Sequence, residues 1–251
     1  MKLRTVTTKP GLVLLLAAAG LAACSGSSDN TQPGPINVIP NPPPPPMASF
    51  MVTVSNTTNA QPLSPIAVIA HDAGYSVFSV GAPATVGLEE LAEGGSNATL
   101  LAEADASASV RTTGSGAAPI GPAGSESVSV QVLESALPGL RLSVSTMLVN
   151  TNDAFTGING MMVGGMAVGD TMMLEGIAYD AGTEDNTELA AEIPGPAGGG
   201  EGFNAIRNDR NDQVTMHLGV VSQDDGFAMS GLTNQHRFDN PVVRVRIERT
   251  Q

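Results

Sequence analysis

The sequence has one cysteine, no tryptophan and few aromatic side chains of any kind, since Phe, Trp and Tyr together make up 3% of its 251 residues. A single cysteine excludes an intramolecular disulfide. The scarcity of aromatic residues, together with 29 Gly and 18 Pro, argues against a helical bundle. It favours a turn-rich fold with a core of Val, Leu, Ile, Met and Ala. The length suits one domain of ordinary to large size, or two small ones.

Positive charge is also scarce. Lys2, Arg4 and Lys9 are the only basic residues before Cys24, and no lysine follows them. The formal net charge is −13, and the chain from Cys24 onward carries 8 Arg against 24 acidic residues, or −16. A domain with this charge repels nucleic acid and anionic lipid headgroups, and it attracts cations. Nucleic acid is therefore not an expected partner.

Residues 1–23 have the pattern of a secretory signal peptide, with a basic start and an apolar centre at Leu12–Ala19 that is too short for a stable membrane span. Their end, Leu21–Cys24, resembles the lipobox of bacterial lipoproteins, in which the acylated cysteine becomes the first residue of the mature chain. In Gram-negative lipoproteins, an Asp directly after the acylated cysteine resembles an inner-membrane retention signal. This sequence has Ser25 at that position instead. We therefore expect a lipid anchor at Cys24 in the outer membrane, with the domain facing the periplasm or the cell surface.

Residues 24–47 have the composition of a linker. Ser, Gly, Asn and Pro dominate, and five consecutive prolines occupy positions 42–46. A proline run adopts the polyproline II conformation at about 3.1 Å per residue and acts as a stiff spacer. The sequence therefore predicts a folded domain over residues 48–251 that is held away from a membrane surface.

The rest of the chain alternates apolar and polar residues, which is typical of half-buried strands. Ile66–His71 is more continuously apolar and predicts a buried strand, and helical spacing occurs only between Val86 and Ser107, where Gly94–Gly95 is a stop signal. These features predict an all-β antiparallel sandwich with one or two short helices. The alternating segments are Ser49–Asn56, Ser127–Glu134, Arg141–Val149, Thr171–Tyr179, Gln213–Val221 and Pro241–Arg249.

Three further stretches are long and rich in glycine, and we expect them to be loops. They are Thr112–Ser125, Gly157–Asp170 and Glu192–Gly202.

Five blocks of the sequence, in this order, resemble the spondin N-terminal domain family in the form found in bacterial secreted and lipid-anchored proteins. They are QPLSPIAVIAHD (61–72), GLEELAEGG (87–95), STMLVNTNDAFTG (145–157), YDAGTEDN (179–186) and FDNPVVRVRI (238–247). The resemblance covers roughly Ala48 to Gln251. It implies an antiparallel β-sandwich similar to C2 domains, a calcium ion bound by loops at one end, and a role in extracellular attachment to a protein or glycan ligand.

The resemblance also implies the calcium ligands. They are Asp153 in one loop block, and Asp180 with Glu184 four residues later in the other. Glu184 departs from the family pattern, where Asp is usual, and adds one methylene to the ligand. Calcium takes about six to eight oxygen ligands, so carbonyl and water oxygens would complete the set.

The spacing of these residues is compatible with such a site. A turn at Gly182 can bring Asp180 and Glu184 together, whereas Asp153 comes from a different loop, so the ion would join two loops. Phe155 would pack beneath the site as a buried anchor. The alternative is that both segments are ordinary polar turns, and Asp185 is either an additional ligand or a solvated neighbour.

A different class of function is a metal-dependent hydrolase of envelope or extracellular polymers. The sequence has no G-x-S-x-G motif, although a spatial Ser/His/Asp triad needs no such motif. His71, His217 and His236 lack the short spacings typical of zinc sites. We therefore expect a calcium-binding, lipid-anchored binding module rather than an enzyme.

Overall fold

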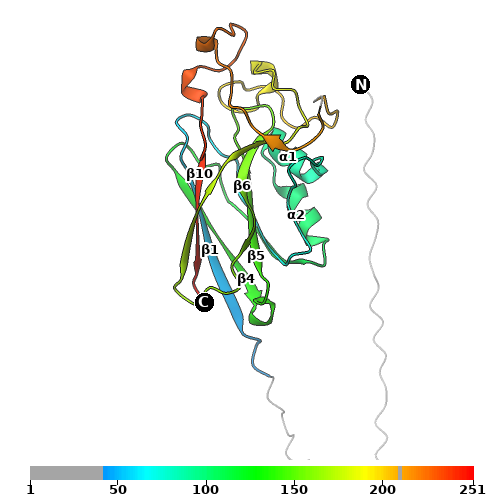
Figure 1. Cartoon of the computed structure of the whole chain (residues 1–251), viewed down its shortest axis with the longest axis vertical. Coiled ribbons are helices and arrows are strands. Elements are labelled where there is room, and N and C mark those ends of the chain that lie inside the picture. The colour runs from blue at the N-terminus through cyan, green and yellow to red at the C-terminus, as the bar shows by residue number, and fades with distance from the viewer. Residues whose placement is uncertain (1–41, 209–210) are drawn as a thin grey trace, which may run out of the picture. The chain divides into compact units, whose positions relative to one another are not determined.

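A computed structural model of the chain describes residues 42–208 and 211–251. In this part, strands form two antiparallel sheets with the orders β4-β1-β10-β7 and β3-β2-β5-β6-β8-β9 (Figure 1). The predicted antiparallel β-sandwich is therefore confirmed. The signal peptide, Cys24 and the linker up to residue 41 lie outside the described residues. The strands are β1 Met47–Asn56, β2 Ala67–His71, β3 Val110–Ser115, β4 Ser125–Leu133, β5 Arg141–Met147, β6 Ala154–Met162, β7 Thr171–Gly176, β8 Ala178–Asp180, β9 Thr215–Met216 and β10 Val243–Arg249.

The main core lies between the two sheets and is formed by the alternating apolar residues of the strands. Phe50 of β1 is opposite Val130 of β4, and Val52 is opposite Val128 on one side and Ile247 of β10 on the other. These side chains belong to one buried cluster. Burying each such side chain contributes about 1.5–3 kcal/mol, which fixes the register because a shift by one residue would expose the whole row.

A second core lies between the six-stranded sheet and two helices, α1 (Val86–Gly94) and α2 (Ala98–Asp105). Leu88 and Leu91 of α1 and Leu100 of α2 pack in one cluster with Ile69 of β2 and Phe155 of β6. Strand β2 is buried on both faces, as its continuous apolar run predicts. The one or two short helices predicted between Val86 and Ser107 are thus two, and they add a partial third layer (Figure 1).

The stop signal that the sequence places after the first helix is also confirmed. Gly95 adopts the left-handed conformation (φ 72°), and its N–H donates to the Leu91 carbonyl. At the other end, the Thr85 side chain accepts a hydrogen bond from the N–H of Leu88 and caps the helix. Four short 3₁₀ helices complete the described helical segments: Glu134–Ala136, Ala190–Glu192, Gln223–Asp225 and Asn234–His236.

Four predicted segments had wrong boundaries. The expected strand Thr171–Tyr179 is divided at Ile177, where the chain leaves the four-stranded sheet as β7 and enters the six-stranded sheet as β8. The expected strand Gln213–Val221 contains only the two residues of β9. Conversely, the predicted loop Gly157–Asp170 contains the second half of β6, and the predicted loop Thr112–Ser125 begins within β3.

The error at β6 has a specific cause. A Cβ atom on Gly157 would lie 1.8 Å from the carbonyl oxygen of Val144 on the neighbouring strand β5. The pairing of β5 and β6 shifts register between Leu142 and Val144. Gly157 is therefore needed for the close approach of the two strands near this irregularity, and it does not mark a loop.

No helix of the described residues is long and apolar enough to cross a membrane.

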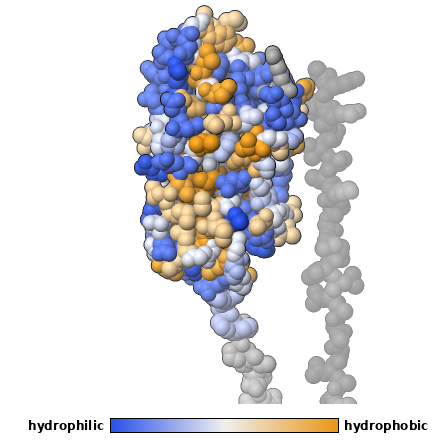
Figure 2. Space-filling view, viewed as in Figure 1, coloured by the Kyte–Doolittle hydropathy of each residue, from blue (hydrophilic) through white to orange (hydrophobic). Residues whose placement is uncertain are grey.

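The loops that follow β8 and precede β10 gather at one end of the sandwich, beside the start of α1 (Figure 1). This end presents both hydrophilic and hydrophobic surface on the face drawn in Figure 2. Large apolar side chains exposed between β8 and β10 include Met216 of β9 and, in the loops, Leu218, Val221 and Met229.

Candidate metal centre

The loop between β5 and β6 carries the first predicted ligand, Asp153, and the loop is buried except for the half-buried Val149. Residues 150–155 are each at most 2% exposed. Asn150 and Asn152 connect this loop to its neighbours: the side-chain amide of Asn150 donates to the backbone carbonyl of Ala60, and the side-chain Oδ1 of Asn152 accepts from the N–H of Glu188. These residues therefore do more than form a surface turn, because their side chains join separate segments.

The pairing of β6 with β8 brings the second predicted ligand, Asp180, to the same place. Ala154 is opposite Asp180 in this pairing, and the N–H of Ala181 donates to the Asp153 carbonyl at 3.2 Å. Asp180 is 8% exposed. Two carboxylates that are 27 positions apart in the sequence thus meet at the end of one strand pair.

The carboxylate of Asp153 has one satisfied oxygen and one orphaned oxygen. Its Oδ2 accepts hydrogen bonds from the backbone N–H groups of Thr183 (2.9 Å) and Glu184 (3.2 Å). Its Oδ1 is buried and has no hydrogen-bond partner among the described residues. A buried polar oxygen without a partner is costly and rare in folded proteins, so this atom requires an explanation.

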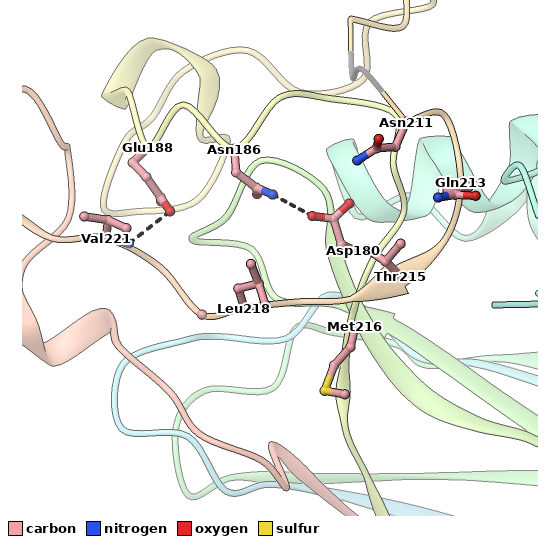
Figure 3. Close-up of a pocket in the computed structure, with 10 residues that line it drawn as sticks. Asp180, Asn186, Glu188, Asn211, Gln213, Thr215, Met216, Leu218 and Val221 are labelled. Atoms are coloured by element: carbon pink, nitrogen blue, oxygen red, sulfur yellow. Dashed lines mark hydrogen bonds between the residues drawn. The ribbon is translucent and has the colours of Figure 1, made fainter. Parts of the chain in front are cut away.

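The turn after β8 positions the remaining groups. Gly182 adopts the left-handed conformation (φ 70°), and its N–H donates to Oδ1 of Asp180 at 2.8 Å. The Asp180 Oδ2 accepts a hydrogen bond from the Asn186 amide, as Figure 3 shows. The turn predicted at Gly182 is therefore present, and it directs the N–H groups of Thr183 and Glu184 at Asp153.

The electrostatics of this cluster are those of uncompensated negative charge. Burial, followed by the charge of Asp180, raises the pKa of Asp153 well above its usual value. Burial, followed by the charges of Glu93 and Glu192, raises the pKa of Glu184 to about 8. Both shifts have the sign expected when carboxylates lack a nearby cation.

Glu184 takes a different position from the two aspartates. Its backbone N–H binds Asp153, but its own carboxylate interacts with Asn152 and with the charges of Glu93 and Glu192. In the described part of the chain, no group of three or more His, Cys, Asp or Glu side chains is arranged to hold a metal ion as it stands. The structure therefore brings Asp153 and Asp180 together. The Glu184 carboxylate lies next to this pair and is not part of it.

The orphaned Asp153 oxygen is the observation that fits a cation here. The two carboxylates that the strand pair brings here, Asp153 and Asp180, offer oxygen ligands, which suit calcium and other hard cations better than zinc. The histidines lie elsewhere in separate environments. His71 hydrogen-bonds Ser143, His217 packs against Phe238, and His236 hydrogen-bonds the backbone of Thr233.

Sequence reasoning missed two acidic residues of this region. Glu93 is 2% exposed on α1, where its Oε2 accepts from the N–H of Asn204. Glu192 lies in the 3₁₀ helix Ala190–Glu192, after the turn that follows β8, and its carboxylate accepts a hydrogen bond from the Thr187 hydroxyl. The one available signal was Glu93 itself, an acidic residue on the otherwise apolar face of a predicted helix.

Phe155 is fully buried, as the sequence predicts. It stacks on Tyr179, the residue next to Asp180, and makes an edge contact with Phe78 at a centroid distance of 5.0 Å. This aromatic cluster lies against the helices rather than between the sheets. It fixes the strand pair that carries both aspartates.

These observations define a β-sandwich domain that carries a buried acidic site in the loops at one end. The chain belongs to the spondin N-terminal domain family, because it matches Spondin_N over residues 55–193, more than half of its length. The matched segment includes Asp153, Asp180 and Glu184. A search of curated proteins found no match to this chain. Membership of this family indicates an extracellular module of the adhesion type.

Proposed function

We propose that this protein is a lipid-anchored module of the bacterial cell envelope that binds one calcium ion at its loop end and attaches to an extracellular protein or glycan. The buried Asp153 Oδ1, which lacks a hydrogen-bond partner, is the observation that carries the calcium part of the proposal. The family match supports the attachment part.

Asp153 and Asp180 would hold the ion through their carboxylates. Glu184 would join them by turning its side chain away from Asn152, and backbone, amide and water oxygens would fill the remaining positions. The ion would neutralise carboxylates whose charges now oppose one another. Its chemistry is structural: it would join the β5–β6 loop to the turn after β8 and so fix the loop end.

The lipid anchor rests on the sequence alone. Cys24 ends a lipobox-like Leu-Ala-Ala-Cys, and a proline-rich spacer separates it from the folded domain. Such a spacer holds a domain away from a membrane without requiring a membrane-spanning helix. We place the anchor in the outer membrane, with the domain on the periplasmic side or at the cell surface.

We propose a binding role rather than hydrolysis because the Asp153 carboxylate is completely buried. A substrate could not reach an ion at that oxygen without displacing the surrounding loops. Calcium-dependent turnover of an ester, glycoside or phosphoester by the purified protein would contradict this part of the proposal.

Isothermal titration calorimetry of the full-length protein with calcium chloride tests the ion directly. We expect about one ion per chain, and no detectable binding at the same concentrations in Asp153→Asn. Asp105→Asn, which makes the same change of charge at an exposed position at the end of α2, is the matched control and should bind normally. Equal binding by Asp153→Asn would refute the site. Labelled palmitate incorporation that persists in Cys24→Ser would refute the anchor.

A further inference from the structure

A cleft of about 460 Å³ opens beside the candidate metal centre (Figure 3). Its walls come from the turn after β8 and from the segment around β9. The volume lies within the range of about 300–1,000 Å³ that is typical of ligand sites. None of its described lining residues is basic. The cleft therefore disfavours phosphate, carboxylate and other anionic ligands.

Glu188 is the most unusual residue of this cleft. It is 4% exposed, and its backbone adopts the left-handed conformation (φ 58°), which is uncommon for a residue other than glycine. Two backbone hydrogen bonds hold it there: its N–H donates to Asn152, and its carbonyl accepts from Gly231 at 2.7 Å. The backbone of Glu188 is therefore held in place at the wall of the cleft.

The carboxylate of Glu188 has one free oxygen. Its Oε1 accepts a hydrogen bond from the N–H of Val221 at 3.1 Å, as Figure 3 shows. Its Oε2 has no hydrogen-bond partner among the described residues, and no arginine or lysine forms an ion pair with it there. Burial of this carboxyl raises its pKa to about 7. A nearly buried carboxylate in a cleft is stabilised when a ligand brings a cation to it.

The other walls suit the rest of a basic side chain. Gln213 and Thr215 alternate with the buried Val214, so both face the cleft, and their side chains offer acceptor oxygens. Leu218 is completely exposed at the rim, and Met216 beside it is 57% exposed. Apolar rim residues of this kind can cover the methylene stem of arginine or lysine, whose charged end requires acceptors.

We propose that this cleft binds an arginine or lysine side chain of a partner protein, with Glu188 as the charged acceptor. The site is separate from the proposed calcium centre except for Asp180, which lines the cleft as well. The inference therefore rests on Glu188, which is not one of the proposed calcium ligands. The −16 charge of the chain from Cys24 onward would attract such a partner over longer distances.

Amide NMR of the full-length protein in millimolar calcium tests the proposal. The probes are the blocked tripeptides Gly-Arg-Gly and Gly-Lys-Gly, and the control probe is Gly-citrulline-Gly, which has the shape of the arginine peptide without its charge. We expect saturable shifts of the Val221 and Gln213 amides with a basic peptide, and binding of the citrulline peptide weaker by about tenfold or more. The arginine and lysine arms then show which cation is preferred.

Glu188→Gln should weaken the binding of the basic peptides by about tenfold or more, because its amide can still accept from Val221 but carries no charge. Glu175→Gln, on the exposed face of β7, makes the same change elsewhere and should have no effect. Leu218→Arg should block the cleft with its own cation, whereas Leu218→Gln should not, and the full exposure of Leu218 makes both variants tolerable to the fold.

The result that overturns the proposal is equal binding of the arginine and citrulline peptides, or no shift of either amide at saturating peptide. Amide shifts caused by a neutral disaccharide but not by the basic peptides would also overturn it and assign the cleft to a glycan. Calcium binding measured on Glu188→Gln keeps the two proposals apart. In Glu188→Gln, normal calcium binding with lost peptide binding supports this inference, whereas normal peptide binding overturns it. A parent protein that binds the basic peptides but no calcium contradicts the proposed function alone.

Discussion

Phe155 and Tyr179 stack across the β6–β8 pair with ring centroids 5.4 Å apart and an interplanar angle of 25°. Each lies close to an aspartate in its own segment: Asp153, in the loop before β6, precedes Phe155 by two residues, and Asp180 directly follows Tyr179 in β8. The buried ring pair thus sets the relative position of two carboxylates whose charges oppose one another. Apolar packing holds together a site that electrostatics alone would open.

Truncation of Phe155 tests this relationship. Phe155→Ala should lower the free energy of unfolding by about 3–5 kcal/mol, because the fully buried ring is lost and a cavity remains. Tyr179→Phe keeps the stacked ring and should change it by no more than about 0.5 kcal/mol. Urea denaturation followed by circular dichroism measures both values. A loss below about 1 kcal/mol in Phe155→Ala would show that the ring pair does not hold the strands.

The turn at Gly182 should tolerate no side chain. Gly182 has φ 70°, and a Cβ atom there would lie 2.3 Å from the carbonyl oxygen of Gln213. Gly199 has the same φ of 70°, but nothing lies within 4 Å of its Cβ position. Gly199→Ala therefore carries only the backbone cost of about 1 kcal/mol, whereas Gly182→Ala adds a steric cost and should destabilise the protein further. Equal losses in thermal denaturation would contradict the close approach.

A buried ion pair holds the segment after Gly202 against α1. Arg207 donates to Glu89, which is 3% exposed, and also to the more exposed Asp212. Glu89→Gln should cost about 1.5–3 kcal/mol, because a neutral amide replaces the buried charged acceptor of the partly exposed Arg207. Asp212→Asn should cost about 1 kcal/mol or less, since that pair is largely solvated. Denaturant titration of both variants checks the order, and a larger effect at Asp212 would reverse the assignment.

Glu188 predicts a particular dependence of stability on pH. Its ordinary pKa of 4.5 is raised to about 7 by burial, so between these values the folded state binds more protons than the unfolded state. The contribution of Glu188 to the free energy of unfolding therefore decreases as pH rises from about 4.5 to 7 and then levels off. Glu188→Gln should remove this decrease and be more stable than the parent at pH 8, on the order of 2 kcal/mol.

The measurement is the difference in unfolding free energy between parent and Glu188→Gln at pH 5 and pH 8. Glu175→Gln, which makes the same substitution at an exposed position, is the control. A difference for Glu188→Gln that is the same at both pH values would show that the carboxyl titrates normally in the fold.

Much of the sandwich could be predicted because alternation follows from one-sided burial. Strands β1 and β4 bury every second residue, and their boundaries agree with the prediction within a few residues. Strand β6 escaped prediction because Gly157 and Gly160, which resemble loop residues, lie within its pairing. The division between β7 and β8 at Ile177 could not be predicted, because alternation shows which side of a strand is buried but not which sheet the strand joins.

The candidate site shows the same limit more strongly. Family resemblance identified Asp153 and Asp180, and spacing identified the turn at Gly182. Neither could show that Glu93, some sixty residues before Asp153, would approach the same loops. Nor could they show that Glu188 would occupy a left-handed position with a buried carboxylate, because neighbouring loops impose that conformation.

The most direct test of the account is a thermal melt of the full-length protein, first in excess EDTA and then across a calcium titration. At a free concentration of 100 times Kd, calcium should stabilise the folded state by about 2.7 kcal/mol and raise Tm accordingly. Asp153→Asn and Asp180→Asn should lose the rise, and Asp105→Asn should keep it. No rise of the parent at millimolar calcium, or an undiminished rise in Asp153→Asn, would contradict the central claim that a calcium ion joins the two loops.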